Sequence, residues 1–193
     1  MTLNTQVAIV GPISNRDALD LAVRAVCIAA GEPHLAEKAV LDEPSSKYSS
    51  DPDVFWWPTK CGQGLPAWTG CRYRMDGPLY REDKYETYED GSDELPYFVA
   101  PACSVLIDWD TTYGYTGPNG IGCSDLHSIA IRYVHDELTR RGLEMHWENE
   151  YDGTWHRGIE GLDTLSAAGL EADLWFRHTA RPAIEASFGI PQP

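Results

Sequence analysis

A glycine-containing loop and the helix predicted after it hold the side chains best suited to chemistry. The segment from Gly117 to Gly122 contains three glycines and a proline, and it directly precedes Ser124, Asp125 and His127. The first turn of a helix presents unpaired backbone N–H groups that bind anions. The loop lacks the lysine of a P-loop and is not a GxGxxG fingerprint in register. The pattern predicts an anion cradle, with a plain tight connection as the alternative.

Aromatic and ionisable residues on both sides of this loop extend the candidate site. The residues expected to line it are Tyr113, Tyr115, Gly120, Gly122, Ser124, Asp125, His127, Trp147, Glu150 and His156. A phosphorylated small molecule or a nucleotide is the candidate ligand. His127 adds positive charge below its pKa, whereas the Asp125 carboxylate opposes an anion at the same helix end.

Two further sets of residues suit a metal ion. One set has two histidines and two carboxylates: Asp125, His127, Glu150 and His156. These side chains suit a divalent metal or an acid–base pair, but Asp125 and His127 fall on different sides of a helical turn. The other set has four cysteines: Cys61, Cys71, Cys103 and Cys123. Their spacing fits no common zinc knuckle. We therefore expect neither a metal nor another cofactor.

Catalytic motifs are missing from the sequence. It contains no Gly-x-Ser-x-Gly elbow, no HExxH helix and no cysteine with a plausible histidine partner. A binding protein is therefore expected rather than an enzyme, and a metal-dependent hydrolase is the remaining catalytic alternative.

The net charge of −15 limits the possible partners. It argues against binding nucleic acid through its phosphates and suits a basic protein partner or the imitation of a polyanion. Between Glu82 and Glu94 seven acids accompany one lysine, which predicts a solvated insertion over about residues 76–101. No basic segment followed by an apolar run begins the chain, and no apolar run reaches membrane-spanning length. We expect a protein of the cytoplasm with no membrane contact.

The positions of apolar residues predict the elements that carry these groups. Strands are expected at residues 6–10, 67–75, 104–110 and 143–151, and helices at residues 15–30 and 124–141, with Ser14 and Ser124 as N-caps. Val7, Ile9, Val105 and Ile107 should be nearly fully buried. Phe55–Trp57 is expected in a long loop held by its rings, with a ligand-stacking platform as the alternative.

Two β-α-β units in this order predict a ferredoxin-like antiparallel sheet within one α+β domain over residues 1–193. The insertion separates the two halves, and a small three-layer α/β sheet is the alternative. Beyond them, Trp155 should begin a short return strand. A helical extension over about residues 160–193 should contain one helix at 163–168 and a second at 170–188.

Several runs of residues resemble a family of actinobacteriophage accessory proteins without an assigned activity. They are Thr112-Tyr113-Gly114-Tyr115, Gly117-Pro118, Gly122-Cys123, Asp125-Leu126-His127, Trp147, Asn149-Glu150, Gly153, His156, and the segments 62–66 and 158–162. The resemblance covers roughly residues 60–165, together with a short N-terminal strand and helix, and implies a small phage-encoded accessory protein. It implies nothing about catalysis.

The expected function is a non-catalytic phage-type protein that binds a host component, in host takeover or immune evasion. An acidic protein-binding inhibitor or DNA mimic is the first alternative, and a metal-dependent hydrolase is the second. A DNA mimic should carry rows of carboxylates on one face, whereas a small-molecule binder should have a pocket lined with aromatic rings and N–H donors. The number of subunits stays open.

Overall fold

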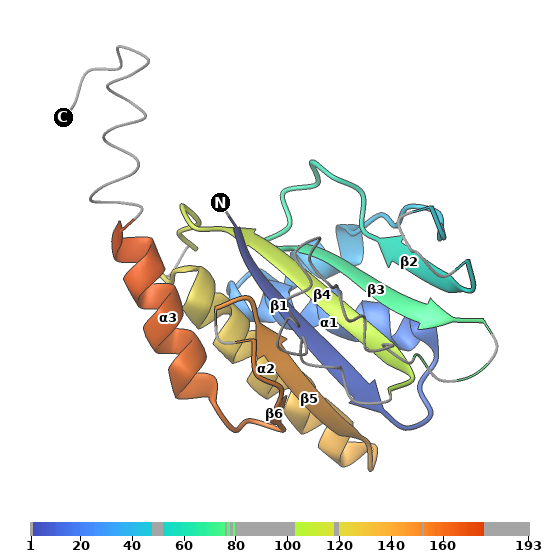
Figure 1. Cartoon of the computed structure of the whole chain (residues 1–193). Coiled ribbons are helices and arrows are strands. Elements are labelled where there is room, and N and C mark those ends of the chain that lie inside the picture. Colours follow the sequence, from blue (N-terminus) through green and yellow to red (C-terminus); the bar gives the residue numbers. More distant parts are fainter. Residues whose placement is uncertain are drawn as a thin grey trace, which may run out of the picture.

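The computed structural model describes residues 2–47, 52–75, 77, 79, 103–117, 120–151 and 153–175. The elements in these residues are β1 (Thr2–Val10), α1 (Asn15–Ala29), the 3-10 helix η1 (Pro33–Lys38), β2 (Val54–Pro58), β3 (Trp68–Arg74), β4 (Val105–Thr112), α2 (Cys123–Arg140), β5 (Glu144–Asn149), β6 (His156–Arg157) and α3 (Leu162–Trp175). The strands form one antiparallel sheet of six in the order β2-β3-β4-β1-β5-β6 (Figure 1). The described part of the chain is an α+β fold.

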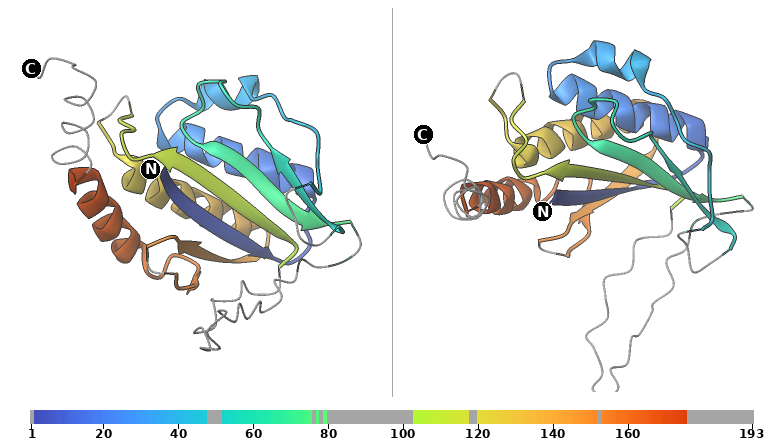
Figure 2. Two further views of the ribbon diagram at one scale, coloured as in Figure 1. Left: turned by 45° about the horizontal axis from the view of Figure 1, so that its top comes forward. Right: turned by 90° about the horizontal axis from the view of Figure 1, so that it is seen from above.

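Helices α1 and α2 cover one face of this sheet, and α3 packs along α2 (Figure 2). Ser14 caps α1 as expected, because its Oγ accepts a hydrogen bond of 3.0 Å from the Asp17 backbone N–H. None of the helices in the described ranges has the length and apolar content needed to cross a membrane.

The central strand β1 determines which side chains enter the core. It pairs with β4 on one side and with β5 on the other. Val7 and Ile9 face the helices with Val105 and Ile107 of β4, and all four are 0% exposed. This burial confirms the expectation for the two segments. Ala8 points to the opposite face, because successive strand residues alternate.

Strand β2 corrects the prediction of a loop at Phe55–Trp57. Phe55 and Trp57 contact Tyr73 of β3, with ring centroids 5.9 Å and 6.5 Å apart, and pack against the core. Trp56 lies on the helix-free face. The loop prediction was wrong because the prolines and glycines around this segment end the strand but do not prevent it.

The structure also corrects two predictions about helices. Helix α2 begins at Cys123, and Gly122 is an N-cap without a side-chain hydrogen bond, so Ser124 is not the cap. Helix α3 runs without a break from Leu162 to Trp175, where two helices were expected. The prediction for residues 176–188 lies outside the described residues.

A polar network crosses the helix-free face of the sheet. Asp108 is 2% exposed and accepts a hydrogen bond of 2.7 Å from Gln6 Nε2, and its other carboxylate oxygen lies 3.1 Å from Arg72 Nε. The Arg72 guanidinium lies 5.4 Å from the centroid of the Trp56 ring. These contacts join β1, β4, β3 and β2, so the network fixes the order of the strands from the side opposite to the helices.

The ends of the predicted insertion also lie on the helix-free face. Leu79 and Cys103 form an antiparallel bridge and pack with Ala8 and Leu106 in a small apolar cluster. The acidic run between Glu82 and Glu94, expected to be solvated, lies outside the described residues.

Gly70 of β3 tests the packing of Trp56. A Cβ atom at this position would lie 2.4 Å from the Trp56 ring, so Gly70→Ala must displace the indole and should lower the free energy of unfolding by about 1–3 kcal/mol. In a double-mutant cycle measured by urea denaturation, Gly70→Ala should cost much less in a Trp56→Ala background. Additive costs would show that the indole is not held against Gly70.

Candidate functional site

His127 lies in the core, although it was expected to face a ligand. The side chain is 0% exposed, and its Nδ1 and Nε2 lie 2.7 Å and 2.9 Å from the hydroxyl oxygens of Thr5 and Thr111. Burial lowers the pKa of His127 to about 3. The imidazole is therefore neutral near pH 7 and has both nitrogens occupied. It joins α2 to the central strands and does not contribute charge to an anion site.

The start of α2 is covered by α3. Ser124 is 5% exposed, and a Cβ atom at Gly169 would lie 2.0 Å from the Ser124 Cβ. One turn further along, the hydroxyl oxygens of Ser128 and Ser166 lie 3.1 Å apart. Asp125 is exposed at the same helix end. Close packing on one side and a carboxylate on the other leave the predicted anion cradle little support.

The aromatic residues of the predicted site lie in or against the main core. Trp147 is 0% exposed and packs against His156 with ring centroids 4.7 Å apart, and its Nε1 donates to the Glu160 carbonyl oxygen. Tyr115 packs against the core, and burial and the charge of Glu32 raise its pKa. Gly120 is exposed with a φ of +74°, a value that suits glycine in a turn.

Tyr113 and Glu150 are a second pair of predicted site residues in contact, besides Trp147 and His156. The Tyr113 hydroxyl donates to Glu150 Oε1 over 2.6 Å, and the Tyr113 ring lies 5.9 Å from that of Tyr151. Burial raises the pKa of Glu150, and the charge of Asp110 on β4 adds to the rise. The ends of β4 and β5 therefore bring aromatic rings and carboxylates together.

Asp110 and Tyr151 belong to this group and were not predicted as site residues. Asp110 lies opposite Asn4 of β1, and the Glu150 N–H donates to the Asn4 carbonyl oxygen. Asp110 and Glu150 thus lie on either side of β1. The signal in the sequence is the alternation of Asp108 and Asp110 with buried residues in a strand, which places both carboxylates on one face.

A metal site has no support in the described ranges. They contain no group of three or more His, Cys, Asp or Glu side chains placed to hold an ion. The four cysteines of the zinc alternative do not converge: Cys61 is exposed, Cys71 and Cys123 lie in the main core, and Cys103 lies in the small cluster on the other face. Burial raises the pKa of both Cys71 and Cys103 to about 12, which keeps these thiols protonated.

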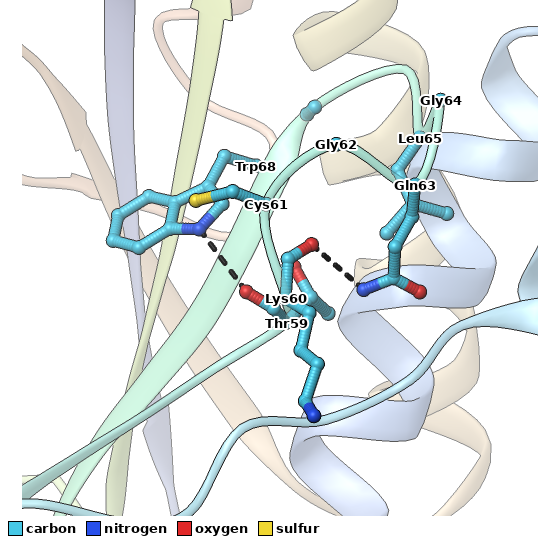
Figure 3. A pocket seen from close by; sticks show the side chains of 9 residues that line it. Thr59, Lys60, Cys61, Gly62, Gln63, Gly64, Leu65 and Trp68 are labelled. Carbon is cyan, nitrogen blue, oxygen red and sulfur yellow. Dashed lines mark hydrogen bonds between the residues drawn. The ribbon is translucent and has the colours of Figure 1, made fainter.

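A small cavity lies in the connection between β2 and β3 (Figure 3). Its volume is about 100 Å³, which is room for about three water molecules. Gln63 Nε2 donates to the Lys60 carbonyl oxygen over 2.7 Å, and Trp68 Nε1 donates to the Thr59 carbonyl oxygen over 3.2 Å (Figure 3). These bonds hold the connection in shape and leave no space for an organic ligand.

The buried imidazole makes stability depend on pH. The pKa of His127 is about 3 in the folded protein and 6.5 in a free side chain. Between these values the unfolded chain binds a proton that the folded chain does not. This contribution to the free energy of unfolding is therefore complete above about pH 6.5 and falls by up to about 1.4 kcal/mol per pH unit on acidification. Urea denaturation between about pH 7 and pH 5 measures the slope.

In this experiment the free energy of unfolding of the His127→Gln variant should depend less steeply on pH than that of the wild type. The His34→Gln variant, changed at an exposed position in η1, should keep the wild-type slope. Equal slopes in the wild type and in His127→Gln would contradict the assignment of a neutral buried imidazole.

Comparison with known proteins adds no constraint to this geometry. No family model, no curated protein and no solved structure matches the chain.

Proposed function

We propose that the chain is a non-catalytic binding protein that engages a basic protein partner through carboxylates on the helix-free face of its sheet. The meeting of Asp110, Tyr113, Glu150 and Tyr151 at the ends of β4 and β5 carries this proposal. We call these four residues the acidic corner. The architecture proposed with it is a ferredoxin-like unit of β1, α1, β3, β4, α2 and β5, with β2 and β6 added at the edges. The strand order β3-β4-β1-β5 supports that assignment.

The carboxylates follow the geometry of the sheet. Asp108 and Asp110 lie on β4, and Glu148 of β5 and Glu150 just after it lie on the other side of β1. Residues two apart in a strand are about 6.7 Å apart, and the two rows are separated by about 10 Å, twice the distance between neighbouring strands. A cationic side chain above β1 therefore lies between the two rows, equally far from each. This arrangement is the one expected of a protein that imitates a polyanion.

The two ends of the rows differ in accessibility. At one end Asp108 and Gln6 are 2% and 8% exposed, and the Gln6 side chain donates a hydrogen bond to the Asp108 carboxylate. At the other end Asp110 is half-buried and Glu150 is exposed, and Tyr151 is 40% exposed. Tyrosine faces attract guanidinium and ammonium groups, and arginine pairs with carboxylates in a bidentate manner. An arginine-rich segment is therefore the partner chemistry that suits the acidic corner.

The alternatives have less support. A phosphorylated ligand at the start of α2 would meet the exposed Asp125 carboxylate and a neutral, buried His127. A metal-dependent hydrolase would need a group of metal ligands that the described residues do not assemble. The resemblance to actinobacteriophage proteins supports a host protein as the partner and the host cytoplasm as the place of action.

An arginine–serine repeat peptide with a fluorescent label tests the proposal by anisotropy. Asp110→Asn with Glu150→Gln should weaken its binding about tenfold, about 1.4 kcal/mol, because the two carboxylates on either side of β1 are removed. Binding should also weaken when salt rises from about 50 to about 200 mM, because the charges are solvent-accessible.

The matched control is Asp17→Asn with Asp136→Asn, which removes two exposed carboxylates from α1 and α2. It should change the affinity less than about twofold, since these groups lie on the helical side and are screened from the acidic corner. An equal loss in both double variants would mean diffuse attraction by net charge, and an absence of binding would refute the proposal.

A further inference from the structure

A cleft of about 290 Å³ is lined by residues of α1, of η1 and of the segment that follows η1. Figure 2 shows α1 and η1 beside each other on the helical side of the sheet. The residues that line it are Arg16, Asp20, Val23, Arg24, Ala36, Glu37, Ala39 and Leu41. Ligand sites have volumes of about 300–1,000 Å³, so this cleft is near the size needed for a small organic molecule. It is almost three times as large as the cavity beside β3.

The charges of this cleft are arranged in two different ways. Arg16 is already occupied: its Nε lies 3.1 Å from the Asp20 carboxylate, and its guanidinium lies 6.0 Å from the Trp57 ring centroid. Arg24 on the α1 wall and Glu37 on the η1 wall are both exposed. Within the described part of the chain, neither has an ion-pair or hydrogen-bond partner. One cation and one anion thus face the same space without pairing.

The floor between these charges is apolar. Val23 is 3% exposed, and Ala36, Ala39 and Leu41 are partly buried against the main core. Small side chains from η1 leave the space open, and Leu41 is fixed by the antiparallel bridge between its backbone and Thr59. The cleft therefore offers a small apolar patch together with opposite charges on its two walls.

We propose that this cleft binds a small zwitterion with an aliphatic body, of the class of free α-amino acids such as leucine. The ligand's carboxylate pairs with the Arg24 guanidinium, its ammonium pairs with the Glu37 carboxylate, and its side chain lies on the apolar floor. A guanidinium binds a carboxylate through two parallel hydrogen bonds, which fixes the ligand's orientation. The site does not depend on the acidic corner, because the two share no residue.

Titrations of the ¹⁵N-labelled chain with leucine and two analogues, followed by NMR, test the charge pattern. Leucine should shift the amide signals of the lining residues with a Kd on the order of 1 mM, a value suited to a small exposed cleft. Isopentylamine lacks the carboxylate and 4-methylpentanoate lacks the ammonium, so each should bind at least about tenfold more weakly. Equal binding of leucine and 4-methylpentanoate would reduce the cleft to an anion site and overturn the proposal.

Two variants assign the charges to their residues. Arg24→Gln should abolish the preference for leucine over isopentylamine, and Glu37→Gln should abolish its preference over 4-methylpentanoate. Arg132→Gln removes an exposed arginine from α2, outside the cleft, and should leave both preferences unchanged. The proposal fails if leucine at about 20 mM shifts no lining residue or if the cleft variants keep both preferences.

Discussion

The antiparallel pairing of β1 with both β4 and β5 is the constraint on which the other contacts depend. With neighbours on both sides, β1 has no free edge, and a slip of one residue would move every side chain to the other face. Val7 and Ile9 would then leave the core, and Gln6 would lose its bond to Asp108. The register of this strand therefore controls both the core under the helices and the polar network on the other face.

His127 provides a hydrogen-bond partner for Thr5, the polar residue that this register places in the core. Thr5 lies among the buried side chains of β1, and an unpaired hydroxyl there costs about 1–3 kcal/mol. The imidazole bonds to Thr5 and to Thr111 of β4, so one side chain from α2 joins the two central strands. Because the bonds use both nitrogens, the histidine that attracts attention in the sequence as a ligand has a structural role.

The sequence contains local signals for the elements but not for these long-range contacts. The apolar pattern at Val105 and Ile107 and the Ser14 cap depend on neighbouring residues, and both predictions are confirmed. The burial of His127 depends on Thr5, 122 residues away, so no local pattern contains it. Strand β2 was missed for a similar reason, since Trp56 has its place only because β3 presents Gly70. Tyr113 and Glu150 could be placed together because strand order alone brings their elements to one end of the sheet.

The net charge of −15 favours a different kind of ligand at each of the two proposed sites. The field of the whole chain attracts cations over about a Debye length, 8–10 Å at ordinary salt, and repels anions. A basic partner approaching the acidic corner gains from this field. A free anion approaching Arg24 loses from it, whereas a zwitterion has no net charge and meets no such repulsion. The unpaired Glu37 carboxylate on the opposite wall also repels a free anion. The local and the long-range electrostatics therefore both favour a ligand that carries two opposite charges.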